Sequence, residues 1–252
     1  LIGIVKLWHV AAVILAIDLI QLPLQNTGGH IAHLGGAIFG YLYIKLLQQG
    51  TDLAKGIRSV ADKYQISVIG GDLSKAQKMS LSITALGEIS GKPITRQGAT
   101  VGDLVYLSAL PGLSAAGLAI LTRGLDRPRY VVEAHLNPKL LPPTELIKVA
   151  TSMCDISDGL ATDAKNLATA SGVNINLSKE LIEKSTDYKD LLELANELGE
   201  DVFDWIISGG EDHFFLATVA PADAHEGIGI QVGKVEKGSG QVLLDGDVVK
   251  KT

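Results

Sequence analysis

Residues Met153 to Asp163 read Met-Cys-Asp-Ile-Ser-Asp-Gly-Leu-Ala-Thr-Asp. The apolar residues before Asp155 predict a strand that ends there, and the apolar spacing from about Gly159 to Ala170 predicts an amphipathic helix. Oxygen-bearing side chains between a strand and a helix suit Mg²⁺ and phosphate, because hard oxygens bind the metal and helix N-terminal amides favour anions. The alternative interpretation is an ordinary helix start with Ser157 or Asp158 as its N-cap.

Two further acidic turns have the same character. Gly70-Gly71-Asp72 follows a short apolar run, and Gly209-Gly210-Glu211-Asp212 precedes another. Glycines in such turns let backbone amides approach a phosphate, while the carboxylates hold a divalent metal. Each turn alone is common turn chemistry, so it is the set of three that favours a phosphate and metal site. Arg96 is a candidate for neutralising phosphate charge, with an ordinary solvated arginine as the alternative.

Composition excludes several classes of protein. The 252 residues carry a net charge of -6, which argues against generic nucleic-acid binding. The single cysteine, Cys154, excludes internal disulfides and a cysteine-based metal site, and its apolar neighbours predict a buried packing role. Neither a P-loop nor the protein-kinase set of motifs occurs in the sequence. An acidic protein that handles phosphates is expected to use its own bound metal.

Residues 1–50 differ from the rest of the chain. Ile2 to Leu24 and His30 to Leu47 are two long apolar runs separated by a Gln-Asn-Thr-Gly-Gly turn. Each is long enough to cross a bilayer as a helix, since about 20 helical residues span the hydrocarbon. The two runs predict a transmembrane hairpin, and a buried hairpin of a soluble domain is the alternative.

The second apolar run carries a family resemblance. Asn26 to Gly40, with two histidines and an Ala-His-x-x-Gly pattern, resembles the last transmembrane helix of rhomboid intramembrane serine proteases. The resemblance covers the family's final two helices and implies that His33 is a rhomboid-type catalytic base. The family's nucleophilic serine, which lies two helices earlier, has no counterpart in this sequence. Since a general base without its serine cannot perform acyl transfer, the resemblance implies descent and not activity.

From about Gly50 onward the composition is that of a soluble domain. A proline-bearing linker, 136–143, suggests a hinge between two lobes. We therefore expect a hairpin at 1–50, a partial N-terminal domain at 51–135 and a C-terminal domain at 136–252. Strands and helices mix without strict alternation, which favours an α+β fold. Helices are expected at 52–64, 111–124, 159–170 and 188–198, and strands at 66–69, 80–86, 102–108, 173–177 and 213–219.

A second resemblance covers nearly all of residues 56–252. Five motifs, taken in chain order, look like those of the thiamine-monophosphate kinase family: Ile69-Gly70-Gly71-Asp72, Arg96-Gln97-Gly98-Ala99-x-x-Gly102-Asp103, Ala115-Ala116-Gly117-Leu118, Asp155-Ile156-Ser157-Asp158-Gly159-Leu160 and Gly209-Gly210-Glu211-Asp212. The resemblance implies the two-domain fold of aminoimidazole ribonucleotide synthetase and its relatives. It also implies ATP- and Mg²⁺-dependent phosphorylation of thiamine monophosphate to thiamine diphosphate, in which positioning and charge neutralisation do most of the work.

The same resemblance assigns roles to individual residues. It implies that Asp72, Asp155 and Asp158 bind Mg²⁺. It implies ATP contacts by four residues: Gly71, Asp72, Arg96 and Ser157. Glu211 is implied to contact the thiamine substrate, whereas Asp163 and Asp212 lie beside these motifs and receive no role.

Some family features have no counterpart in the sequence. The family's N-terminal Asp-Asp-Ala motif should precede Asp52, and a Gly-Trp-x-His-Phe-like segment should follow near Thr252. We therefore expect this chain to be weakly active or inactive alone, because a metal clamp without its full ligand set loses electrostatic stabilisation. The resemblance implies a homodimer through the N-terminal domain, of which this chain has only part. The kinase portion should be cytoplasmic, anchored to a lipid bilayer if the hairpin is genuine. The alternatives are an inactive rhomboid remnant carrying a kinase fragment, and a chimeric gene model.

Overall fold

The computed structural model describes residues 53–72, 74, 77–78, 80–89 and 91–249. The chain divides into two compact units, one comprising residues 1–84 and the other residues 85–252. Each unit is described by itself.

The first unit contains one of the predicted helices. A helix covers 53–63, as the spacing predicts, and Ala61 is buried on it. The strand predicted at 66–69 does not form, and its apolar residues Ile66, Val68 and Ile69 are all exposed. The strand predicted at 80–86 is also absent. An isolated strand leaves its backbone groups unpaired, and no described strand pairs with either segment.

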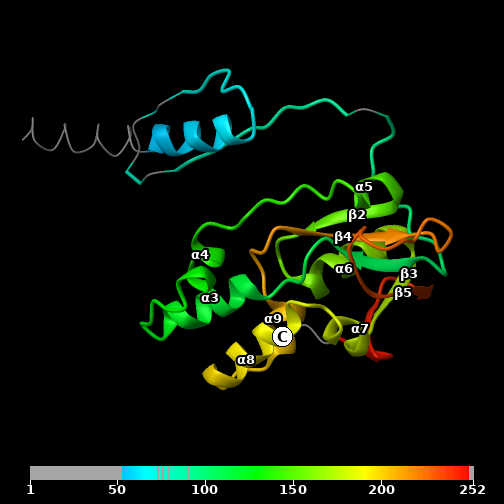
Figure 1. Ribbon diagram of the computed structural model, residues 1–252. Coiled ribbons are helices and arrows are strands. Elements are labelled where there is room, and N and C mark those ends of the chain that lie inside the picture. Colours follow the sequence, from blue (N-terminus) through cyan, green and yellow to red (C-terminus); the bar gives the residue numbers. More distant parts are fainter. Residues whose placement is uncertain (1–52, 73, 75–76, 79, 90, 250–252) are drawn as a thin grey trace, which may run out of the picture. The chain divides into compact units, whose positions relative to one another are not determined.

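The second unit contains a sheet with helices packed on it (Figure 1). Its strands are β1 (Leu104–Leu107), β2 (Ala150–Ile156), β3 (Val173–Leu177), β4 (Phe214–Val219), β5 (Ile230–Lys237), β6 (Val242–Leu244) and β7 (Asp247–Val248). Its helices are α3 (Leu113–Thr122), α4 (Arg129–Leu136), α5 (Leu146–Val149), α6 (Leu160–Ser171), α7 (Lys179–Glu183), α8 (Tyr188–Leu198) and α9 (Val202–Ser208).

The strands of the second unit lie in the order β2-β4-β1-β5-β3-β6-β7. Every neighbouring pair is antiparallel except β3 and β6, which run parallel. Helices and a mainly antiparallel sheet in one unit confirm the predicted α+β class. The domain boundary predicted at 135/136 stays a prediction; β1, on its N-terminal side, pairs with β4 and β5 on its C-terminal side.

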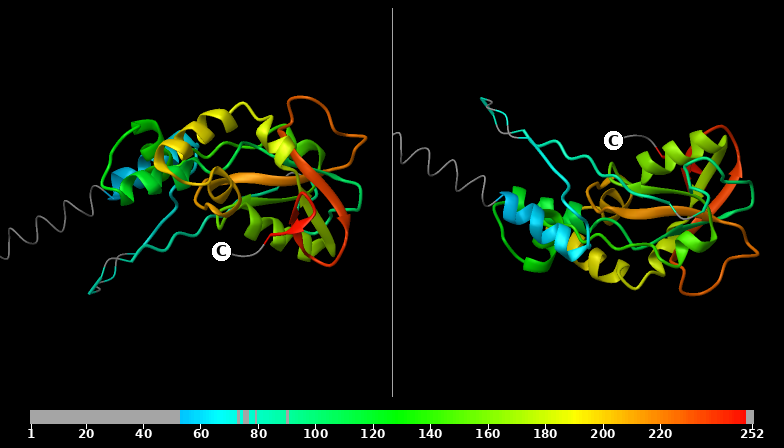
Figure 2. Two further views of the ribbon diagram at one scale, coloured as in Figure 1. Left: turned by 90° about the horizontal axis from the view of Figure 1, so that it is seen from below. Right: turned by 90° about the horizontal axis from the view of Figure 1, so that it is seen from above.

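The two faces of the sheet bury different side chains. Along β4, Leu216 belongs to the main core, whereas Ala217 and Val219 belong to a smaller cluster, as the period of two in a strand requires. Helix α6 packs on the sheet, where it contacts β2, β3, β4 and β6 (Figure 2). Its two leucines, Leu160 and Leu167, are fully buried in the main core. Short α5 lies against β2 and buries Leu146 in the smaller cluster.

The hairpin predicted at 1–50, with His33, lies outside the described residues. Among the helices that the structure describes, none has the length and apolar character needed to cross a membrane.

Candidate functional site

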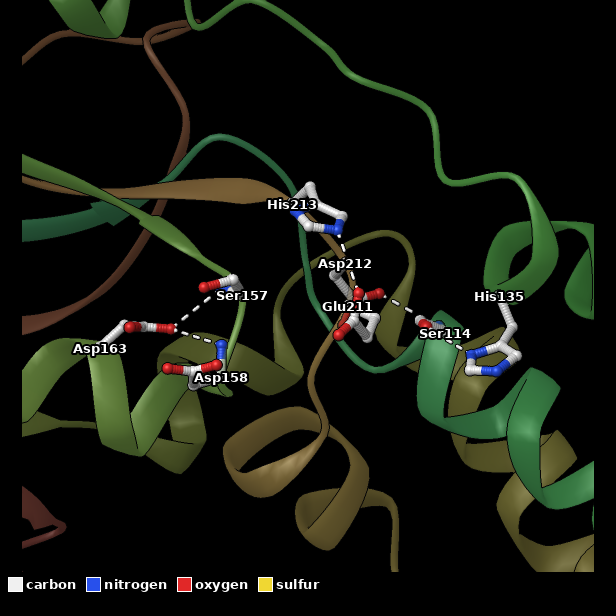
Figure 3. A network of polar contacts seen from close by, with 8 residues as sticks. All are labelled: Ser114, His135, Ser157, Asp158, Asp163, Glu211, Asp212 and His213. Carbon is white, nitrogen blue, oxygen red and sulfur yellow. Dashed lines mark hydrogen bonds and ion pairs between the residues drawn. The ribbon is translucent and has the colours of Figure 1, made fainter. Parts of the chain in front are cut away.

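The turn between β2 and α6 is held by the carboxylate of Asp163. Its Oδ2 accepts hydrogen bonds from the backbone N–H groups of Ser157 and Asp158, each at 3.0 Å (Figure 3). Asp163 is buried in the first turn of α6, so it reaches back over the turn from the helix that follows. The N-cap position is Gly159, with φ 100°, and no side chain caps it. The interpretation of Ser157 or Asp158 as an N-cap is therefore wrong, and their side chains are not engaged in capping.

Arg96 lies beside the end of β2. Its Nη2 is 3.8 Å from Oδ1 of Asp155, and both side chains are about half exposed. Two hydrogen bonds to backbone carbonyls hold the segment that carries the arginine. The N–H of Met153 donates to the carbonyl of Thr95 at 3.0 Å, and the Ser171 hydroxyl donates to the carbonyl of Arg96 at 2.9 Å. The structure thus brings together a guanidinium and a carboxylate, those of Arg96 and Asp155, that are 59 positions apart in the sequence.

The loop that follows α9 packs directly on the β2 end. The N–H of Glu211 donates to the carbonyl of Ser157 at 2.9 Å, and the N–H of His213 donates to the carbonyl of Ile156 at 3.0 Å. A side chain at Gly210 would place its Cβ 2.7 Å from the Ser157 carbonyl oxygen, so glycine is required for this approach. The Glu211 side chain is 66% exposed and its Oε2 lies 3.3 Å from Nε2 of His213. Two of the three acidic turns are therefore neighbours in space.

Asp212 points in the opposite sense, into the protein. It is 4% exposed, and its carboxylate accepts a hydrogen bond from the N–H of Gly112 at 2.8 Å. It accepts a second one from the N–H of Ser114 at 3.1 Å (Figure 3). These groups begin α3, whose N-cap Gly112 has no side chain to cap the helix. Sequence reasoning missed the roles of Asp163 and Asp212. A carboxylate in a first helical turn that reaches back to earlier amides is a known local pattern for Asp163, whereas Asp212 gives no local signal.

Burial perturbs the ionisation of three groups at this end of the sheet. Desolvation raises the pKa of Asp163 and of Asp212, and in both cases the bonds from backbone amides oppose the rise. Burial also raises the pKa of the Cys154 thiol to about 12. A buried cysteine with that pKa confirms the predicted packing role and is a poor nucleophile.

A cavity of about 410 Å³ lies between α3 and the loop that carries Glu211. On its wall, the hydroxyl of Ser114 is 3.1 Å from Nδ1 of His135. Helix α3 contributes its apolar residues, and polar residues come from α3 and from the surrounding segments: Ser114, Ala115, Leu118, Ala119, Thr122, Arg123, His135, Glu200, Ser208, Gly209, Gly210 and Glu211. An apolar wall with a few convergent polar groups is typical of a small-molecule site.

Gly71 and Asp72 belong to the first compact unit. Both are exposed, and the hydroxyl of Ser74 donates to Oδ2 of Asp72 at 3.4 Å. Of the residues assigned by the second resemblance, the second unit thus holds Arg96, Asp155, Ser157, Asp158 and Glu211. Within the described part of the chain, no three histidine, cysteine, aspartate or glutamate side chains form a group that could hold a metal ion.

Two known proteins that this chain resembles in sequence share one name. No family model matches it. Thiamine-monophosphate kinase from Mycobacterium tuberculosis is 34% identical over 206 residues, covering 79% of this chain and 60% of that protein. The Corynebacterium glutamicum enzyme of the same name is 35% identical over 210 residues, covering 79% and 61%. The chain thus spans about three fifths of the length of these curated relatives.

Solved structures agree with the sequence comparison. The crystal structure of thiamine monophosphate kinase from Aquifex aeolicus matches with a TM-score of 0.55 at 31% identity, covering 62% of this chain and 54% of that one. A structure of AaThiL complexed with AMPPCP and TMP matches with a TM-score of 0.54, also at 31% identity, covering 63% and 52%. Over about four fifths of its length, this chain is thus similar in sequence to thiamine-monophosphate kinases.

Proposed function

We propose that the site at the end of β2 serves the ATP- and Mg²⁺-dependent phosphorylation of thiamine monophosphate to thiamine diphosphate. The observation that carries the proposal is the direct contact between two acidic turns, through the bond from the Glu211 N–H to the Ser157 carbonyl at 2.9 Å. One turn offers carboxylates for a metal and the other offers a carboxylate for a cationic substrate. A similar structure is described as a complex with AMPPCP and TMP, which supports a site for both reactants.

The ATP side of the proposed site is built around Arg96. The arginine is paired with Asp155 at 3.8 Å, and the exposure of its side chain leaves it accessible to a phosphate. Ser157 lies two residues further on, with its backbone held by Asp163 and its hydroxyl not used for capping. The nucleotide contacts of Gly71 and Asp72, which belong to the first unit, stay predictions.

Mg²⁺ fits the chemistry of the residues at the β2 end. Asp155 is half exposed and Asp158 is exposed, so two hard oxygen donors reach solvent from one turn. Because two carboxylates bind a divalent ion weakly, the proposal gives the nucleotide phosphates remaining positions around the ion. Metal binding by Asp72 stays a prediction. When bound, the metal would neutralise phosphate charge, and the Asp163 bonds keep the ligand-bearing turn in place.

The thiamine side of the proposed site is the loop at Glu211. Thiamine monophosphate carries a positive thiazolium ring, and the exposed Glu211 carboxylate lines the cavity of about 410 Å³ beside α3. A carboxylate at the edge of an apolar pocket is suited to a ring that is both cationic and flat.

The cytoplasmic location and the homodimer remain predictions. The rhomboid-like hairpin and its contact with a bilayer gain no support from the relatives named above.

Thermal unfolding with and without Mg²⁺–ATP tests the nucleotide side. A ligand at about 100 times its dissociation constant stabilises the folded chain by roughly 2.7 kcal/mol. We expect Mg²⁺–ATP to raise the midpoint of the wild-type chain and to leave that of Asp155→Asn unchanged. Asp126→Asn, a substitution at an exposed aspartate away from the site, should respond like the wild type. An equal rise for Asp155→Asn, or no rise for the wild type, contradicts the proposal.

A further inference from the structure

Asp212 connects two parts of the candidate site that are far apart in the sequence. On one side, the loop 209–213 is fastened to β2 by the backbone bonds of Glu211 and His213. On the other side, the carboxylate of Asp212 binds the amides of Gly112 and Ser114, 100 and 98 residues away. The loop is therefore fixed at both of its edges, and Asp212 supplies the side-chain contact with α3.

The backbone around Asp212 adopts an uncommon conformation. Glu211 has a φ of 65° and His213 a φ of 55°, and both lie in the left-handed region that residues with side chains seldom adopt. Such conformations persist where surrounding contacts hold them. With a left-handed residue on each side, Asp212 is 4% exposed while the Glu211 side chain is 66% exposed.

The burial of Asp212 decides how it can act. Its carboxylate faces the start of α3, and burial there keeps it away from a substrate in the cavity. Ser114 joins this contact to the cavity wall, because its N–H binds Asp212 and its hydroxyl lies 3.1 Å from Nδ1 of His135. Both Ser114 and Glu211 line the cavity, so Asp212 lies behind the wall that they form.

We propose that Asp212 is a positioning residue that sets the affinity for thiamine monophosphate by holding Glu211 at the cavity wall against α3. The identity of the substrate in this inference rests on the proposed function, whereas the hydrogen bonds of Asp212 are independent of it. Asp163 plays the corresponding structural part on the other turn, where it is 2% exposed and also accepts two backbone bonds. The two buried aspartates thus form a matched pair, one behind each half of the site.

The test compares Asp212→Asn with Asp163→Ala by calorimetry. Both carboxylate oxygens of Asp212 accept a bond, so in Asp212→Asn the NH₂ group faces a donor whichever way the amide turns. One oxygen of Asp163 accepts both of its bonds, so Asp163→Ala is needed to remove them. For Asp212→Asn we expect thiamine monophosphate to bind roughly tenfold more weakly, because a displaced contact group loses much of its effect, and AMPPCP–Mg²⁺ to bind as before. For Asp163→Ala we expect the reverse. Equal losses of both affinities in Asp212→Asn would overturn the inference, since a general loss of structure predicts that result.

A double variant asks whether Asp212 acts through Glu211. If it does, Glu211→Gln removes the contact that Asp212 positions, and adding Asp212→Asn should weaken thiamine monophosphate binding by less than about twofold more. Multiplication of the two single effects would show independent action and overturn the inference. Glu211→Gln alone should leave the thermal midpoint unchanged, because its side chain is exposed.

A measurement without substrate separates this inference from the proposed function. In amide hydrogen-exchange measurements, Asp212→Asn should speed the exchange of the Glu211 N–H, which donates to the Ser157 carbonyl in the wild-type chain, and leave that of the Asp158 N–H, which donates to Asp163, unchanged. If that variant does not fold, Asp212→Glu, which keeps the carboxylate but displaces it, should show the same change. Unchanged exchange of the Glu211 N–H overturns the positioning role. If the exchange result holds but the wild-type chain does not bind thiamine monophosphate, that failure counts against the proposed function instead.

Discussion

The backbone N–H of Glu211 donates a hydrogen bond to the carbonyl oxygen of Ser157 at 2.9 Å. This bond joins a loop between α9 and β4 to a turn between β2 and α6, and so connects the two acidic motifs that lie in the second unit. Because β2 and β4 are adjacent antiparallel strands, the end of β2 and the start of β4 meet at one edge of the sheet. The order of strands therefore explains why residues more than fifty positions apart share one site.

Replacing Gly210 should separate the two turns. The Cβ of Gly210→Ala would lie 2.7 Å from the Ser157 carbonyl oxygen, so the loop must move or strain. We expect a loss of about 1–3 kcal/mol in the free energy of unfolding, as for other overpacked sites. Chemical denaturation gives this value. Gly87→Ala is the matched control, because a Cβ there meets nothing within 4 Å, and a similar loss in both variants would contradict the contact.

Removing the Asp163 carboxylate should destabilise the β2–α6 turn. Asp163→Ala leaves the amides of Ser157 and Asp158 without their acceptor in a part-buried place. Unsatisfied groups of this kind cost about 1–3 kcal/mol, reduced here by release of the carboxylate from burial. Urea unfolding should show the loss, while the exposed control Asp223→Ala stays within about 0.5 kcal/mol of the wild type. Unchanged stability of Asp163→Ala would mean that the turn holds itself.

The pH dependence of Asp212 has a defined sign. Burial raises the pKa of its carboxyl above 3.8 in the folded chain, so the folded state binds this proton more tightly than the unfolded state. The stabilisation from that proton is fully present below the unfolded pKa and is lost as pH rises through the folded pKa. Relative to Asp212→Asn, the wild-type chain should lose unfolding free energy as the pH rises above 3.8. A relative gain as the pH rises would show that the amide bonds outweigh burial.

Cys154 should resist alkylation in the native chain. A thiol with a pKa of about 12 is ionised at neutral pH to a fraction on the order of 10⁻⁵, and the side chain is 7% exposed. We expect iodoacetamide to label the folded protein very slowly and the urea-unfolded protein completely, as read by mass spectrometry. Since Cys154 is the single cysteine in the sequence, each added mass reports this residue. Rapid labelling of the folded chain would place the thiol in solvent.

The sequence predicts local elements of the second unit well. Helices α6 and α8 and strand β3 lie where the apolar spacing places them, because each buries one face along a continuous run of residues. The strands predicted at 66–69 and 80–86 fail for the opposite reason. Alternating apolar residues show which face of a strand would be buried. Whether the strand forms also depends on a neighbouring strand to pair with, which the local sequence does not reveal.

The motifs of the candidate site could be predicted from the sequence, whereas the buried aspartates that hold those motifs in place could not. Glycine and carboxylate turns mark Asp155, Ser157, Asp158 and Glu211 in the sequence, and their mutual proximity follows once β2 and β4 are paired. The role of Asp212 depends on amides at the start of α3, and 98 or more residues separate the partners. No local pattern encodes a hydrogen bond between a side chain and a distant backbone group. Asp163 accepts bonds from backbone groups no more than six residues away, so its role could have been predicted from the spacing.

Calorimetric titration of thiamine monophosphate into the chain, in the presence of AMPPCP and Mg²⁺, tests the joint site as a whole. The proposal predicts saturable binding of one thiamine monophosphate per chain, weakened at least about tenfold by Glu211→Gln and also weakened when AMPPCP and Mg²⁺ are omitted. Such a result would place both reactants at the contact between Glu211 and Ser157. Binding that is absent, or that is unchanged by Glu211→Gln, would contradict it.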